Sequence, residues 1–178
     1  MTEKVEFGDD YEFPKEVHNM LVAAQSAHVQ FSAMADSKAS ILLGASFVVF
    51  SLTLGEMQSN AISLPMLLLG AFSFAATVFS VLTVLPEFRG KSRKSVPNPL
   101  FFGVFSRMDE EEFIDTLVGA MRSEERAYRM MARDLYQNGA VLRRHKYRYL
   151  AYAYRTFLIG IVATALAFVG EAVMALIA

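Results

Sequence analysis

Residues 35–55, with the sequence ADSKASILLGASFVVFSLTLG, decide the fold of this chain. Asp36 and Lys38 lie directly before seventeen uncharged residues that run from Ala39 to Gly55. At a rise of about 1.5 Å per helical residue, this run covers roughly 25 Å, close to the hydrocarbon thickness of a bilayer of about 30 Å. The stretch therefore predicts a transmembrane helix whose charged pair lies near the lipid headgroups.

Two further apolar runs follow the first one. The second, from Met57 to Leu85, contains twenty-nine uncharged residues and is long enough to span a bilayer with tilt. The third, from Thr156 to Gly170, is followed by Glu171 and seven more uncharged residues. We expect three transmembrane passes, with the first two joined as a tight hairpin.

The composition agrees with an integral membrane protein. Hydrophobic residues make up 54% of the 178 residues, yet 20% are charged, so the charges must be segregated from the apolar runs. The chain contains no cysteine, which excludes disulfides, thiolate metal sites and a cysteine nucleophile. The first run lies behind a mostly acidic leader, so it does not match a signal peptide and should stay in the mature protein.

Apolar spacing outside the runs predicts long helices. One begins at Lys15 and meets no proline before Gly55, and a second apolar stripe extends from Phe113 to Tyr152. We expect an all-α membrane protein, in which three transmembrane helices continue into a cytosolic helical bundle through the first and third passes. The expected segments are an acidic lead-in at 1–14, a cytosolic helix at 15–38, a two-pass hairpin at 39–86, a cytosolic loop and long helix at 87–155, and a third pass at 156–178.

The second stripe has polar members at Glu124, Asn138 and His145. An inward polar group costs stability unless it has a partner, so we expect these side chains to bond to one another, to His28 or to a bound molecule.

Lysine and arginine predict the orientation. Fourteen of the seventeen lie between Glu87 and Arg155, and none lies in the short hairpin turn. Because cytoplasmic loops are enriched in these residues, we expect the N-terminus inside and the C-terminus outside.

Each predicted pass has a face of small residues. Gly44, Gly70 and Gly160 mark these faces, which would let helices approach closely within an assembly. Glu171 continues the third face; it either reaches the outer surface or contributes to a ring of carboxylates in a homo-oligomer.

The sequence contains no motif of a known catalytic site. We find no phosphate loop, no His-Glu-x-x-His pattern and no nucleophile elbow, and the three histidines are too dispersed to suggest a metal site. We therefore expect neither an enzyme, nor a metal, nor a bound cofactor.

A series of short motifs is more specific than the composition. In chain order these are Ala35-Asp36-Ser37-Lys38-Ala39, Ile41-Leu42-Leu43-Gly44, Asn98-Pro99-Leu100-Phe101-Phe102-Gly103, Glu110-Glu111-Glu112-Phe113 and Lys146-Tyr147. Their order around a two-pass hairpin and ahead of a last pass resembles the Pycsar transmembrane effector family, over nearly the whole chain from about Val17.

This resemblance implies a bacterial anti-phage effector that acts by abortive infection. In such systems a partner cyclase makes cyclic CMP or cyclic UMP upon infection, and the effector impairs the inner membrane and kills the cell. The implied partners are therefore the cyclic nucleotide, the cyclase and the lipid bilayer, with no nucleic acid. An alternative is a membrane scaffold or regulatory subunit that recruits a partner through its cytosolic helices.

The resemblance assigns no binding residues, so the candidates come from this sequence. A cyclic nucleotide needs a cation or a helix N-terminus for its phosphate, and a hydrogen-bonding or stacking group for its base. The candidates are Arg143, Arg144, His145 and Lys146, then Asn138 and Tyr149 on the same stripe, and Asp36 and Lys38 at the same predicted depth. Two alternatives stay open: a lipid-facing basic collar, and a buried Asp36 and Lys38 pair that locks the helix junctions.

Overall fold

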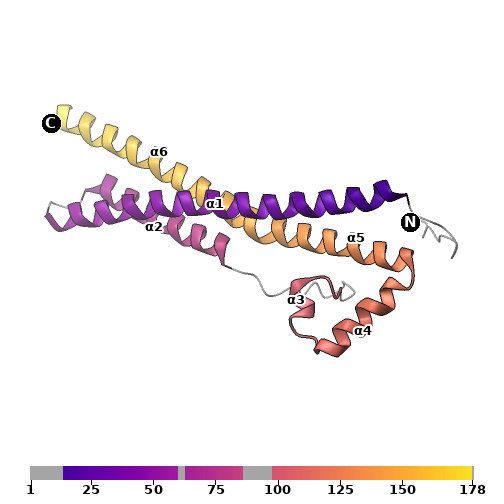
Figure 1. The fold of residues 1–178 in the computed structure, drawn as a ribbon. Coiled ribbons are helices and arrows are strands. Elements are labelled where there is room, and N and C mark those ends of the chain that lie inside the picture. The colour runs from indigo at the N-terminus through magenta and orange to yellow at the C-terminus, as the bar shows by residue number, and fades with distance from the viewer. Residues whose placement is uncertain (1–13, 60–62, 86–97, 178) are drawn as a thin grey trace, which may run out of the picture. The chain divides into compact units, whose positions relative to one another are not determined.

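The computed structural model describes residues 14–59, 63–85 and 98–177, and every regular element within these ranges is helical (Figure 1). In chain order the elements are α1 (Lys15–Ser59), α2 (Leu64–Val84), α3 (Phe102–Phe105), α4 (Glu110–Met121), α5 (Glu124–Val141), the π-helical turn η1 (Leu142–Lys146) and α6 (Tyr147–Ile177). The predicted all-helical class is confirmed. Three helical stretches, α1, α2 and the run from α5 through α6, are long and apolar enough to cross a bilayer.

The described residues form two compact units, and α1 contributes to both. Residues 14–31 and 98–142 form one unit, which we call the polar unit. Residues 32–85 and 143–177 form the other, which we call the apolar unit. The predicted lead-in at 1–14 and the start of the predicted loop at 87–97 lie almost entirely outside the described residues.

Helix α1 is a single helix of 45 residues. Its sequence contains no proline, and its two glycines are isolated, so nothing in it enforces a break. Helix α2 begins with Pro65 in its first turn, where a missing backbone N–H costs nothing. It ends at Val84, and the following Leu85 is extended, as expected for a residue that precedes a proline.

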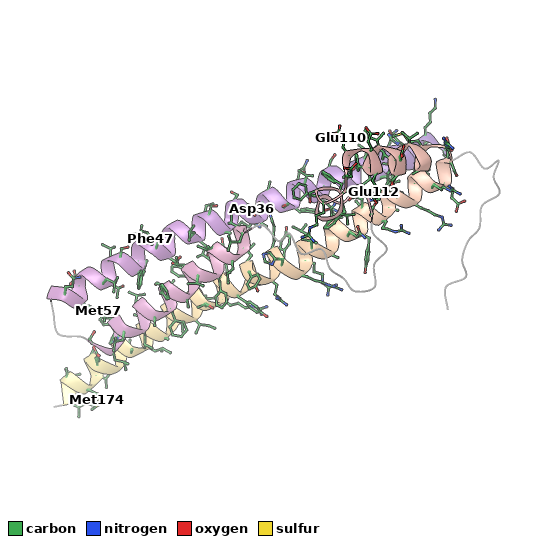
Figure 2. The ribbon with its side chains drawn as sticks, turned by 90° about the horizontal axis from the view of Figure 1, so that it is seen from below. Asp36, Phe47, Met57, Glu110, Glu112 and Met174 are labelled. Carbon is green, nitrogen blue, oxygen red and sulfur yellow. The ribbon has the colours of Figure 1, made fainter. Side chains whose placement is uncertain are left out.

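Small side chains form the packed surfaces of the apolar unit. On α1 the buried positions are Ala35, Ala39, Leu42, Ser46 and Thr53, on α2 they are Pro65, Gly70, Ser73, Ala76, Ser80 and Thr83, and on α6 they are Leu150, Ala153, Gly160 and Thr164. Large apolar side chains face outward instead, among them Phe47 on α1 and Met174 on α6 (Figure 2). This arrangement is the reverse of a water-soluble core, and it is typical of helices that pack within lipid.

Several hydroxyl groups along these small surfaces bond to one another or to the backbone, whereas the buried Ser80 and Thr164 hydroxyls have no partner among the described residues. Ser46 Oγ and Thr77 Oγ1 lie 2.9 Å apart and join α1 to α2, and Thr77 also donates to the Ser73 carbonyl at 2.9 Å. The Thr53 and Thr83 hydroxyls each donate to the carbonyl four residues earlier, at 2.8 and 2.9 Å. The bonded hydroxyls are therefore compatible with a low-dielectric surrounding.

The polar unit contains shorter helices, of which α4 has a side-chain N-cap. Asp109 caps α4, because its carboxylate accepts a hydrogen bond from the Glu111 N–H at 3.1 Å. The acidic residues of the first turn, including Glu110 and Glu112, interact favourably with the positive end of the helix dipole (Figure 2). The long apolar stripe of this region was compatible with one helix or two, and the structure divides it, because Ser123 adopts an extended backbone and separates α4 from α5.

The loop before α4 is anchored by an asparagine. Asn98 is fully buried, its Nδ2 donates to the Met130 carbonyl on α5 at 3.0 Å, and its Oδ1 accepts from the Leu100 N–H at 3.3 Å. Phe101 is buried, but Phe102 is exposed and belongs to the single turn α3. Burial of this aromatic segment is therefore only partial.

Candidate functional site

A polar cluster around the buried Asp134 lies in the polar unit between α1 and α5. We call it the Asp134 cluster; it comprises Gln25, His28, Asp134, Asn138 and Gly139. Asp134 Oδ2 accepts from Gln25 Nε2 at 3.2 Å and from Asn138 Nδ2 at 2.9 Å. Asp134 Oδ1 and His28 Nδ1 are buried without a hydrogen-bond partner. The cluster therefore combines an acceptor and an imidazole nitrogen that the protein itself does not satisfy.

The Asp134 carboxyl is the dominant charge of this cluster. Only 2% of the residue is exposed, and it lies in the part of α5 that precedes the apolar run beginning at Thr156. Burial raises its pKa above the ordinary range, while the Asn138 hydrogen bond and the nearby His28 partly oppose this effect. The site is consequently dry enough to penalise an unpaired carboxylate.

Gly139 shapes the other side of the cluster. A Cβ atom at this position would lie 3.1 Å from His28 Cε1, tighter than an ordinary van der Waals contact. The absence of a side chain thus lets the imidazole ring lie directly against the α5 backbone. Gly139 is one turn beyond Leu135 and follows Asn138, so the same helical turn supplies both the amide and the ring contact.

A second polar contact lies in the apolar unit, where α1 meets the end of η1. Lys146 Nζ donates to both Asp36 oxygens, at 2.7 and 2.6 Å, and to Ser32 Oγ at 2.8 Å. The side chains are 20% exposed for Lys146 and 38% for Asp36. This is a charge-assisted contact of one ammonium with both carboxylate oxygens, and on α1 it lies directly before the apolar run that begins at Ala39. We call it the Asp36–Lys146 pair.

An aromatic row continues from this pair along α6. His145 and Tyr149 rings meet edge to face at 5.0 Å between centroids, Tyr149 meets Tyr152 at 6.4 Å, and Tyr152 meets Phe79 of α2 at 5.8 Å. His145 Nε2 also lies 3.3 Å from the Leu85 carbonyl at the end of α2. The row therefore ties η1 and α6 to the end of α2.

The predicted nucleotide-binding residues are distributed over both units. Arg143 and Arg144 are exposed in η1, and the Arg148 guanidinium rather than either of these lies over the Tyr149 ring, at 5.3 Å. Lys38 is exposed, and its backbone carbonyl accepts from the Tyr154 hydroxyl at 3.4 Å. Lys146 and Asp36 are paired with each other, whereas Asn138 belongs to the Asp134 cluster.

The predicted assembly residues fall into two groups. Gly70 and Gly160 are buried against side chains of this same chain, Thr53 and Phe72 respectively. Gly44 is exposed, and a methyl group added there would meet no heavy atom within 4 Å; Glu171 is exposed as well. Of the predicted faces, those on α2 and α6 are therefore used within the chain, whereas the Gly44 face is open.

Sequence reasoning missed Asp134 and Gln25. Asp134 lies one turn before the predicted Asn138, and this i to i+4 spacing of an acid and an amide on one face was the available signal. Gln25 gave no signal, because its partner is 109 residues away along the chain. Among the described residues, no three histidine, aspartate or glutamate side chains gather in a way that could hold a metal ion.

Long helices with small inner surfaces and large apolar outer side chains define an α-helical membrane protein. Residues 19–171 match the Pycsar effector protein domain family, PycTM, and the chain belongs to this family. The resemblance found in the sequence motifs is thereby confirmed.

A curated relative comes from Propioniciclava tarda. It is the Pycsar effector protein PtPycTM, 33% identical over 105 residues, which cover 57% of this chain and 50% of the relative. The match thus spans about half the length of that relative. No solved structure matches the chain.

Proposed function

We propose that this chain is a membrane effector of a bacterial anti-phage system, and that it impairs the inner membrane when a cyclic pyrimidine nucleotide, cyclic CMP or cyclic UMP, binds to it. A partner cyclase supplies the nucleotide, and cell death limits the infection. Membership of the Pycsar effector family supports this role.

The observation that carries the proposal is the continuity of α1. This one helix of 45 residues bears His28 of the Asp134 cluster in the polar unit, then Asp36 and the first apolar run in the apolar unit. Because a helix transmits displacement along its axis, a ligand that binds only one arrangement of the polar unit biases the packing of the apolar helices.

In this proposal the polar unit is cytoplasmic, and α1, α2 and α6 cross the membrane. The N-terminus is inside and the C-terminus outside, as the lysine and arginine distribution predicts. Arg143 and Arg144 lie at the membrane surface, where their guanidinium groups face phosphate, either of the ligand or of a lipid headgroup. The Asp36–Lys146 pair holds α1 to the end of η1 in the resting state.

Damage to the membrane requires more than one copy. Three helices with packed, small inner surfaces leave no conducting path among themselves, so we propose that effector chains assemble when the ligand binds. The exposed Gly44 face of α1 offers a surface for close helix approach in such a homo-oligomer.

The test combines binding and leakage. The purified full-length protein is titrated calorimetrically with cyclic CMP, cyclic UMP, cyclic AMP and cyclic GMP, and each nucleotide is then added to dye-filled vesicles of phosphatidylethanolamine and phosphatidylglycerol that contain the protein. We expect one pyrimidine nucleotide to bind selectively and release dye. The purine nucleotides and protein-free vesicles serve as controls.

Absence of binding by all four nucleotides, in protein with a helical circular dichroism spectrum, would contradict the proposal. That result would favour the scaffold alternative, in which the polar unit recruits a protein partner. Binding without dye release would retain the sensor and refute membrane disruption by this chain alone.

A further inference from the structure

The Asp134 cluster contains two unsatisfied atoms of different chemistry. Asp134 Oδ1 is an acceptor, and His28 Nδ1 is a donor or an acceptor according to its tautomer; both are buried and have no hydrogen-bond partner. Buried polar atoms in folded proteins are almost always hydrogen-bonded, because an unpaired one loses the bonds it made to water. Two such atoms in one cluster indicate a site that a bound molecule completes.

The carboxylate restricts which molecule this can be. Its free oxygen accepts a hydrogen bond, so the incoming group must be an N–H or O–H donor. A phosphate is disfavoured at this position, because two negative charges would face each other in a dry surrounding. Among the described residues no cluster suited to a metal ion is present. The chemistry therefore matches a neutral nitrogen heterocycle with an N–H edge.

Gln25 provides the route into the cluster. Its side chain belongs to a residue exposed to solvent, and its amide donates to Asp134 Oδ2 at 3.2 Å, whereas the half-buried Asn138 donates to the same oxygen at 2.9 Å. An incoming N–H group can donate to the free Oδ1 once the exposed Gln25 side chain moves aside, while Asn138 keeps the carboxylate in place. Gln25 is thus a cover over the carboxylate, and Asn138 is a positioning residue.

We propose that the Asp134 cluster is the base-recognition subsite of the nucleotide sensor, where Asp134 accepts the ring N–H or exocyclic amino group of a pyrimidine and His28 contacts the neighbouring polar edge. This inference rests on the proposed function. The free acceptor also explains how binding is coupled to conformation: the bound state satisfies atoms that the protein alone leaves unpaired.

The experiment compares three variants of the full-length protein by calorimetric titration with the same four cyclic nucleotides. Asp134→Asn removes the anionic acceptor with little change of shape. Asp115→Asn makes the same chemical change at an exposed position of α4 and is the matched control. Gln25→Ala removes the covering amide. Circular dichroism and thermal melting verify that each variant folds.

We expect Asp134→Asn to weaken binding of the preferred pyrimidine nucleotide by about 10- to 100-fold, the range for a lost hydrogen bond to a charged group. Asp115→Asn should bind like the wild type. Gln25→Ala should bind more tightly than the wild type, a result that a merely structural role of the Gln25 hydrogen bond would not produce.

The outcomes separate this inference from the proposed function. If the wild type binds a pyrimidine nucleotide and a folded Asp134→Asn variant binds it with the same affinity, the subsite is overturned and the sensor function remains intact. A wild-type protein that binds no cyclic nucleotide would overturn both. If Asp134→Asn fails to fold, the Gln25→Ala titration decides: tighter binding than the wild type supports the subsite, and equal or weaker binding overturns it.

Discussion

Asp134 shows how one buried carboxyl can influence the stability of a whole unit. The folded protein binds the Asp134 proton more tightly than the unfolded chain, because burial raises the pKa of this carboxyl. At a pH below the ordinary carboxyl pKa, the group is protonated in both the folded and the unfolded state, so its ionisation does not affect the free energy of unfolding. As the pH rises through the ordinary range and then through the raised pKa, ionisation costs more in the folded state, and stability falls.

We predict that Asp134→Asn is more stable than the wild type at pH 7.5, by about 1–2 kcal/mol, because a buried amide needs no charge desolvation and can still accept the bonds from Gln25 and Asn138. The advantage should shrink as the pH is lowered toward 4. Thermal unfolding followed by circular dichroism across this pH range measures it. A pH-independent difference between the two proteins would contradict an ionised Asp134, and Asp115→Asn again serves as the control.

Individual partners were less predictable than the kinds of residue involved. The sequence places Asp36 and Lys146 at a similar depth because each lies ahead of an apolar run, and the structure pairs them. The sequence did not distinguish Lys146 from Arg143 and Arg144. The π-helical turn η1 is wider than an α-helical turn, and it changes which side chain faces α1. Asp134 was missed because its burial depends on the register of α5 against α1.

At the scale of helices, close packing of α2 on α6 depends on a glycine. A Cβ atom at position 160 would overlap the Phe72 Cβ, and backbone-proximal atoms such as this one cannot rotate away. We predict that Gly160→Ala separates the two helices and destabilises the protein by roughly 1–3 kcal/mol, the range for overpacking. Thermal unfolding in detergent measures the effect.

Gly170→Ala is the matched control on the same helix. Gly170 is exposed, and an added methyl group meets no heavy atom within 4 Å, so this variant should keep wild-type stability or gain slightly from helix propensity. Equal unfolding temperatures for Gly160→Ala and the wild type would show that α2 and α6 can separate without loss of stability. That result would refute a stabilising role for their close packing.

Periodicity predicted the helices more accurately than their ends. Helix α1 and the apolar part of α6 follow from long, proline-free apolar patterns. The position of the interruption at Ser123 was not predicted, because the surrounding sequence has no proline, and the nearest glycine, Gly119, lies within α4. The break is instead associated with tertiary packing, since α4 folds back against α5.

For the whole molecule, composition was the strongest predictor. Segregation of charges from apolar runs indicated a membrane protein before any contact was known, and the outward large side chains and inward small ones agree with it. What composition could not supply is the choice of inner face on each helix. On α1 the predicted Gly44 face is exposed, while the alanines and hydroxyls of Ala35 to Thr53 are packed.

The orientation of the chain leads to a last prediction, which the absence of native cysteines makes simple to test. Gln58→Cys places a thiol at the exposed end of α1, and Asp115→Cys places one on exposed α4. Since the lysines and arginines concentrate between Glu87 and Arg155, the positive-inside rule puts position 115 in the cytoplasm and position 58 outside. A membrane-impermeant maleimide should therefore label Gln58→Cys in intact spheroplasts, and Asp115→Cys only after permeabilisation.

The reverse labelling pattern would place the polar unit outside the cell, where a nucleotide made in the cytoplasm could not reach the Asp134 cluster. It would refute the proposed sensor together with its topology.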